Sequence, residues 1–191
     1  MRDGRPASDT RRAKHWTARI AMWVVVIGVG CAAGALMSDL LGLYVNVTPS
    51  IPRGVYRVTQ AKPRRGTIVL ACVPRSMAVW AKQRGYLPPG ECPGGAMPLG
   101  KIVAGVPGDT VVVSATGAVV NGQPLARSQP LTQDRFGRPL PHYPFGTYVL
   151  GGDDYWLESA HPRSFASRYI GPVTTANLIT TLTPVWVQRS P

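Results

Sequence analysis

A run of eighteen residues without a charge, from Ile20 to Met37, follows a basic arm at the start of the chain. Residues 1–19 hold six arginine and lysine residues against two aspartates. At 1.5 Å per residue the run makes a helix of about 27 Å, and the next few residues extend it to the roughly 30 Å of a bilayer core. Because basic arms stay on the cytoplasmic side, the sequence predicts a cytoplasmic arm at 1–19, a transmembrane anchor at 20–43 and an exported domain at 44–191.

The same run is open to a second interpretation, a signal peptide that is removed after export. Ala32, Ala33 and Ala35 supply the small residues of a cleavage site. The apolar segment of a signal peptide is typically about 7 to 15 residues long. Since this run is longer, the pattern favours an uncleaved anchor.

The composition indicates one β-rich domain beyond the anchor. The 191 residues include 21 Gly and 19 Pro, and only 16% are charged, which favours short strands and turns over long helices. The net charge of +12 suits a nucleic acid, an anionic membrane surface or an acidic partner. Basic and aromatic residues do not interleave in the exported part, which lies across the membrane from DNA, so we expect contact with membrane lipid and none with nucleic acid.

Short β-branched and apolar runs, bounded by Gly, Pro, Asn or Asp, predict eight strands after the anchor. Eight short strands suggest a mainly β fold, with the sheet folded over or closed into a barrel. The predicted strands are residues 54–58, 66–73, 102–106, 110–113, 118–120, 148–150, 155–157 and 178–187.

Three further segments have a clear local pattern. The pair Asn121-Gly122 predicts a hairpin with a type I′ turn. Residues 76–85 are the one predicted helix after the anchor, and Pro88-Pro89-Gly90 ends it. The proline-rich residues 126–146 predict a long surface excursion.

Cys72 and Cys92 allow more than one interpretation. In an oxidising compartment a disulfide between them would stabilise the fold by about 3 kcal/mol, and the sequence leaves disulfide and free thiols equally open. A zinc site that adds His142 and His161 lacks any closely spaced pair of ligands. We therefore expect no metal.

The motifs of several common catalytic sites are absent from the sequence. It has no His-Glu-x-x-His, no Gly-x-Ser-x-Gly and no Gly-Lys-Ser/Thr phosphate loop, and no histidine lies in a nucleophile motif. Three other segments stand out, and each alone has an ordinary explanation as a linker turn, a solvated strand end or a loop. In chain order they are Thr48-Pro49-Ser50-Ile51-Pro52-Arg53-Gly54-Val55-Tyr56, Gly100-Lys101-Ile102-Val103-Ala104-Gly105-Val106-Pro107-Gly108-Asp109 and Pro162-Arg163-Ser164-Phe165-Ala166-Ser167-Arg168-Tyr169-Ile170-Gly171.

Taken together and in this order, the three segments resemble the membrane-bound signal peptidases that use a Ser/Lys dyad. The single anchor and the pattern Thr-Pro-Ser-Ile-Pro-x-Gly-x-Tyr are similar to the TraF branch of that family, the conjugative-transfer peptidases that mature pilin precursors. The resemblance covers about residues 20–175. It implies a signal peptidase-like β domain behind a single N-terminal transmembrane helix.

The resemblance implies roles for four residues. Ser50 is implied as the nucleophile, Lys101 as the general base and Ser164 as the hydroxyl that orients the lysine, while Thr48 joins the Ser50 amide in an oxyanion hole. A lysine accepts a proton only when it is neutral, and at the ordinary pKa near 10.4 only about 0.04% is neutral at pH 7. Burial at the head of an apolar strand must therefore lower the pKa of Lys101.

The third segment departs from the family pattern at its acidic positions. The family typically has Gly-Asp before this segment and Ser-x-Asp-Ser-Arg within it, whereas a gap-free comparison places Glu158-Ser159 and Ala166 there. Asp153 or Asp154 replaces the missing partner of the arginine only if the loop folds back. An acidic residue is implicated in joining pilin ends in TraF-type enzymes, so we expect hydrolysis and leave ring closure open.

These patterns predict a single-pass serine endopeptidase of the bacterial inner membrane with a periplasmic catalytic domain. Its expected partner is an exported or membrane-tethered precursor protein, above all a pilin subunit of a conjugative transfer system. A Ser/Lys mechanism needs no cofactor. Two alternatives stay open: a general signal peptidase, and a non-catalytic, membrane-anchored assembly protein of a secretion or conjugation machine.

Overall fold

The computed structural model describes residues 9–159 and 161–188, which divide into one compact unit up to Leu43 and another from Tyr44. The first eight residues of the arm expected at 1–19 lie outside the described residues. Helix α1 (Asp9–Leu40) runs through most of the first unit. No helix in the described part of the chain is both long enough and apolar enough to cross a membrane. The anchor expected at 20–43 therefore stays a prediction.

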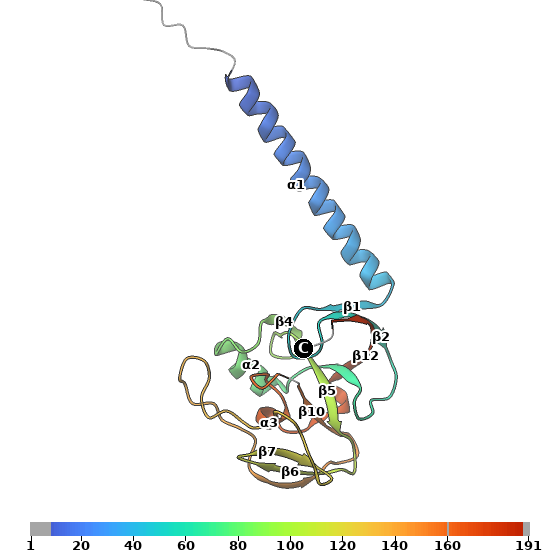
Figure 1. The fold of residues 1–191 in the computed structure, drawn as a ribbon, viewed down its shortest axis with the longest axis vertical. Coiled ribbons are helices and arrows are strands. Elements are labelled where there is room, and N and C mark those ends of the chain that lie inside the picture. Colours follow the sequence, from blue (N-terminus) through green and yellow to red (C-terminus); the bar gives the residue numbers. More distant parts are fainter. Residues whose placement is uncertain (1–8, 160, 189–191) are drawn as a thin grey trace, which may run out of the picture. The chain divides into compact units, whose positions relative to one another are not determined.

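The chain beyond α1 is built on two sheets (Figure 1). The larger sheet contains β1 (Leu43–Asn46), β2 (Gly54–Thr59), β12 (Leu178–Val187), β3 (Ile68–Ala71), β5 (Leu99–Gly105), β10 (Asp154–Glu158) and β11 (Val173–Thr174), in that spatial order. From β2 onward, all neighbours pair antiparallel. The smaller sheet has the order β8 (Gln123–Pro124), β7 (Gly117–Val120), β6 (Thr110–Ser114) and β9 (Gly146–Val149). The mainly β fold is confirmed.

All eight predicted strands are present, and their ends shift by up to three residues. The prediction omitted β1, β8 as a separate strand, β11 and β4 (Pro89–Cys92). Each of these has four residues or fewer, and β4 contains the Pro89-Gly90 pair that was expected to end a helix. Strands β8 and β11 have two residues each, too few to show an alternating pattern. Among the described residues, strand β4 pairs only through isolated bridges to Ala96 and not with another strand.

The predicted helix at 76–85 is confirmed as α2 (Arg75–Gln83), which buries Ala78 and Ala81. The expectation of a single helix after the anchor is wrong, because α3 (Ser167–Ile170) forms a further short helix. One helical turn contains too few residues to show an apolar period of 3.6. The turn is instead defined by its packing, since Ser167, Arg168 and Tyr169 are all buried.

Two loop predictions are also confirmed. Asn121 and Gly122 both have positive φ angles, 48° and 79°, as a type I′ turn requires. Residues 126–145 contain no strand and run as a long excursion between β8 and β9. Ser128 attaches the start of the excursion to the smaller sheet, because its hydroxyl accepts from the Ala118 amide at 2.8 Å and donates to the Leu125 carbonyl at 2.7 Å.

Strand β10 connects the two main parts of the core. Its Leu157 packs in a cluster with Val69 and Val103 of the larger sheet, whereas the neighbouring Trp156, fully buried, packs with Val111 of the smaller sheet. Adjacent side chains of a strand point to opposite faces. Both sheets therefore hold β10, and with it the residues that follow Leu157.

Cys72, just after β3, and Cys92, at the end of β4, form a disulfide. The open question about these thiols is thereby answered. The zinc alternative is wrong, because the bond uses both sulfurs, and the described residues contain no group of three metal-ligating side chains. His142 stacks on Phe145 with ring centroids 4.1 Å apart.

Candidate active site

Ser50 lies in a turn between β1 and β2, and the residue after it fixes that turn to the core. Ile51 is only 1% exposed and packs with Tyr56 and other apolar side chains of the larger sheet. Gly100 of β5 leaves room for it, since a Cβ at Gly100 would lie 3.0 Å from the Cδ1 of Ile51. This contact docks the Ser50 turn on the strand that carries Lys101.

Asn46 holds the same turn through hydrogen bonds. Its side-chain amide donates to the carbonyl oxygens of Thr48, Ile51 and Pro52 at 2.8, 3.0 and 3.1 Å. Its Oδ1 accepts from the amide and the hydroxyl of Thr48 at 3.2 and 2.8 Å. Asn46 is 3% exposed, so these bonds are sheltered from water and determine the path of the chain around Ser50.

Lys101 is the third residue of β5 and lies opposite Val69 of β3. It is 2% exposed. Burial lowers the pKa of its ammonium group from 10.5 to about 7. The nearby Glu158 carboxylate opposes this shift, whereas the positive charge of Arg168 adds to it. A buried lysine with this pKa is neutral in about half of the molecules at pH 7, as the sequence argument required of a general base.

Ser164 joins the other two side chains. The ammonium nitrogen of Lys101 donates to the Ser164 hydroxyl at 2.8 Å, and the hydroxyls of Ser164 and Ser50 are 3.0 Å apart. The three residues come from β5, from the loop before α3 and from the turn after β1. A continuous chain of hydrogen bonds therefore runs from Ser50 through Ser164 to Lys101.

Ser159, which follows β10, supports the backbone of Ser50. Its hydroxyl donates to the Ser50 carbonyl oxygen at 2.7 Å and accepts from the His161 amide at 3.1 Å. Neither Asn46 nor Ser159 was predicted as a site residue. The one sequence signal for Asn46 is a polar residue inside the otherwise apolar Tyr44–Val47 run, while Ser159 carries no comparable signal.

Thr48 is exposed, and its hydroxyl donates to Asn46. In this conformation the hydroxyl hydrogen is directed to the Asn46 side chain, while the carbonyl oxygen of Thr48 accepts from the same residue. The expected role of Thr48 in an oxyanion hole stays a prediction.

A buried ion pair lies beside the hydrogen-bonded chain. Arg168 of α3 is fully buried and donates to Glu158 at 2.6 Å. Its guanidinium also donates to the carbonyl oxygens of Arg127 and Pro162 at 2.6 and 3.2 Å. The expected acidic partner of the arginine is thus present in Glu158.

Asp153 and Asp154, the alternative partners expected for Arg168, form their hydrogen bonds elsewhere. Asp153 accepts the Thr175 amide through its backbone carbonyl, and the Asp154 carboxylate accepts from the Gly151 amide. Neither forms an ion pair with Arg168 within the described residues. Glu158 reaches the guanidinium from the end of β10, whereas Ala166 at the family's usual acidic position is buried without a charge.

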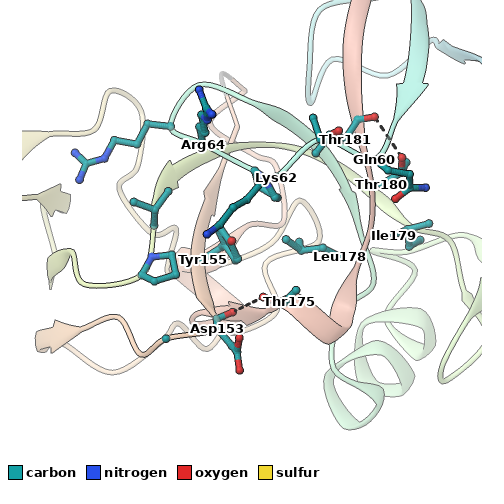
Figure 2. A pocket seen from close by; sticks show the side chains of 16 residues that line it. Gln60, Lys62, Arg64, Asp153, Tyr155, Thr175, Leu178, Ile179, Thr180 and Thr181 are labelled. Carbon is teal, nitrogen blue, oxygen red and sulfur yellow. Dashed lines mark hydrogen bonds between the residues drawn. The ribbon is translucent and has the colours of Figure 1, made fainter.

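One cavity of the described residues is separate from these side chains. It has a volume of about 820 Å³ and is shown in Figure 2. The loop between β2 and β3 contributes Lys62 and Arg64, and the ends of β10 and β12 contribute Tyr155 and Leu178. The residues of the Ser50–Lys101 chain do not line it.

Comparisons with known proteins find a matching family model and several related proteins. The family model for signal peptidase, peptidase S26, matches residues 13–187. The plasmid transfer protein TraF of Escherichia coli is 39% identical over 170 residues, which cover 87% of this chain and 95% of that protein. The probable conjugal transfer protein TraF of Sinorhizobium fredii is 37% identical over 152 residues, which cover 78% and 79%. A crystallised signal peptidase I of Enterococcus faecalis aligns at 20% identity with a TM-score of 0.39, over 65% of this chain and 100% of its own.

Proposed function

The chain belongs to the signal peptidase family, peptidase S26, and from this premise we propose that it is a serine endopeptidase in which Ser50 is the nucleophile and Lys101 the general base. The observation that carries the proposal is the hydrogen-bonded chain from Ser50 through Ser164 to the buried Lys101. A lysine with a purely structural role does not require an environment that favours its neutral amine.

The reaction begins with Lys101 neutral. Ser50 then donates its hydroxyl proton to Ser164, and Ser164 donates its own to the unprotonated amine of Lys101. The Ser50 oxygen attacks the scissile carbonyl as its proton leaves, and an ester forms when the Lys101 ammonium protonates the departing amine. A water molecule then attacks the ester as the neutral amine of Lys101 takes a proton from it. The carboxylic acid is released, and the Lys101 ammonium returns a proton through Ser164 to the Ser50 oxygen.

The negative charge that develops on the carbonyl oxygen needs hydrogen-bond donors. The Ser50 amide is one donor in this proposal. The Thr48 hydroxyl is the second donor, and it turns from Asn46 toward the substrate to reach the carbonyl oxygen. The Oδ1 of Asn46 then still accepts a hydrogen bond from the Thr48 amide. Thr48 is exposed, so its side chain has room to rotate.

The proposed substrate is a pilin precursor of a conjugative transfer system. The support comes from the relatives, which are a plasmid transfer protein and a probable conjugal transfer protein. The proposed location is the bacterial inner membrane, with residues 20–43 as the anchor and the domain after it in the periplasm. The Cys72–Cys92 disulfide supports export, since such bonds persist in oxidising compartments.

The dyad is tested by cleavage of a pilin precursor of a conjugative transfer system. Ser50→Ala and Lys101→Met are each expected to reduce cleavage by about 10⁴-fold, measured as the shift of the precursor on a gel. Ser114→Ala and Lys62→Met are matched controls, because they remove the same groups far from the site, and both are expected to cleave normally. Normal cleavage by Ser50→Ala or Lys101→Met contradicts the proposal.

The substrate is tested by offering a general secreted precursor beside the pilin precursor. Cleavage of the pilin precursor alone supports the specific peptidase, and cleavage of both at similar kcat/KM supports a general signal peptidase instead. The location is tested by adding protease to spheroplasts. Digestion of residues 44–188, together with thiol labelling at Cys31 alone, is the expected result, and protection of the domain contradicts the proposed topology.

A further inference from the structure

A second cavity, of about 630 Å³, borders the segment that carries Ser164. Phe165, the residue after Ser164, is part of its lining together with Tyr86 and Tyr169. Arg163, the residue before Ser164, and Arg135 of the excursion also line it. The cavity is therefore one residue along the chain from the hydroxyl that contacts both Ser50 and Lys101.

The aromatic side chains form a continuous surface in this cavity. The rings of Phe165 and Tyr169 stack with centroids 5.6 Å apart, and the ring of Tyr86 lies 6.1 Å from that of Phe165. The Tyr169 hydroxyl accepts from the Leu131 amide at 3.0 Å, which fixes the excursion against these rings. Such a surface favours an aromatic or large aliphatic group.

The outer wall of the cavity is held in place by Asp134. Its carboxylate accepts from the Tyr86 hydroxyl at 2.7 Å and from the Arg138 guanidinium at 2.6 Å. It also accepts from the amides of Phe136 and Arg138 at 2.8 and 3.0 Å. The wall is thus formed before any ligand arrives, which reduces the entropy lost on binding. Arg138 balances the charge of Asp134.

Two positive charges remain at the edge of the cavity. Arg135 and Arg163 are exposed, and neither forms an ion pair in the part of the chain that the structure describes. Arg135 lies over the ring of Phe136 at 4.6 Å, which holds its guanidinium beside the opening. An apolar surface with two cations at its edge is complementary to an apolar side chain next to a carboxylate.

We propose that this cavity is a subsite for the substrate polypeptide, which takes an aromatic or large aliphatic side chain with an aspartate or glutamate beside it. The inference rests on the proposed function, since the scissile bond must lie at Ser50. In this proposal the substrate chain, which advances about 3.3–3.6 Å per residue when extended, follows the Arg163–Phe165 segment from Ser50 to the cavity. The substrate's sequence in this region determines which precursor is bound.

Binding is measured by fluorescence anisotropy on the full-length Ser50→Ala protein, which binds without cutting. The probes are three fluorescein-labelled alanine-glycine peptides whose central pairs are Glu-Phe, Gln-Phe and Glu-Ala. The Glu-Phe peptide is expected to bind most tightly. Adding Arg163→Gln or Arg135→Gln to this protein is expected to weaken the affinity for the Glu-Phe peptide by about three- to fivefold each. The affinity for the Gln-Phe peptide is expected to stay unchanged.

The matched control is Arg57→Gln, which removes an exposed arginine of β2 that does not line the cavity. It is expected to bind all three peptides as the parent does. Equal affinity for the three peptides, or no effect of either cavity variant, overturns the subsite.

The two proposals fail in different ways. Cleavage by the wild-type chain without any peptide preference overturns the subsite alone. Peptide preference that depends on both arginines, together with no cleavage of any exported precursor, overturns the endopeptidase function.

Discussion

At the residue scale, Lys101 acquires its chemistry from burial. Removal from water lowers the pKa of its ammonium group to about 7, and the opposing effects of Glu158 and Arg168 on it are smaller. These two groups are also paired with each other. The environment of Lys101 therefore favours the neutral amine without adding a net charge beside it.

This pKa predicts the dependence of activity on pH. Because the neutral amine is the active form, kcat/KM is expected to rise tenfold per pH unit on the acid side and to level off above about pH 7. The measurement is kcat/KM for a peptide substrate between pH 5 and 10. A rise centred near pH 10, as for an exposed lysine, contradicts the assignment.

A histidine titrates near pH 6.5, so the position of the rise alone does not identify the base. His142→Ala and His161→Ala are expected to leave the profile in place. Loss of the rise in either variant shows a histidine mechanism. The sequence argument required only that burial lower the pKa of Lys101. The structure moves it toward neutral pH because Lys101 is almost completely removed from solvent.

Asn46 is a positioning residue for the nucleophile. Asn46→Ala removes five hydrogen bonds around the Ser50 turn and is expected to lower kcat by about 100-fold through misplacement of the hydroxyl. KM and the pH of the rise are expected to stay unchanged, since Lys101 is untouched. Asn177→Ala, which makes the same chemical change away from the site, is the control. Full activity of Asn46→Ala contradicts the role.

At the element scale, the Glu158–Arg168 pair fixes β10 to α3. Arg168 also holds the excursion through the Arg127 carbonyl, so one side chain joins three segments. Removing one partner of a buried pair leaves an uncompensated charge, which typically costs about 3–5 kcal/mol. The pair therefore matters for the position of Ser164, which lies three residues before the start of α3.

Glu158→Gln is expected to lower the free energy of unfolding by about 3–5 kcal/mol, measured by urea denaturation. The neighbouring Asp154→Asn removes a carboxylate that, among the described residues, accepts a hydrogen bond only from the Gly151 amide. It is expected to change the free energy of unfolding by less than about 1 kcal/mol. A Glu158→Gln protein as stable as the wild type means that the pair makes no net contribution to the fold.

At the scale of the whole molecule, the site lowers stability at neutral and acid pH. The pKa of Lys101 is about 7 in the folded protein and near 10.5 in the unfolded chain, so the unfolded chain binds more protons between these values. The free energy of unfolding due to this group is therefore expected to rise with pH from about 7 to 10.5 and to be flat below 7.

Lys101→Met isolates the contribution of the lysine. It keeps a long side chain at the buried position and removes the titrating group. The variant is expected to lose the rise in stability between pH 7 and 10.5 and to be more stable than the wild type at pH 7, in thermal or urea unfolding across that range. A wild-type profile without this rise means that Lys101 keeps its ordinary pKa in the folded protein.

The sequence by itself determined the local features of this protein. Eight β-branched or apolar runs identified eight of the twelve strands of the described residues, Asn121-Gly122 identified the hairpin turn, and residues 76–85 identified α2. Each depends on neighbours within a few residues, which fix φ, ψ and the alternation of side chains. The order of the Ser50, Lys101 and Ser164 motifs also identified the family.

Only the tertiary structure decided which groups meet. Lys101 and Ser164 are 63 positions apart and Ser50 and Ser164 are 114 apart, yet sheet pairing brings their polar atoms within hydrogen-bond distance. The hydrogen bonds of Asn46 and Ser159 form only after the segments that carry these residues have packed together. The same holds for the ion pair between Arg168 and Glu158. Burial and the charges of distant residues then set the pKa of Lys101, and neither is a property of the local sequence.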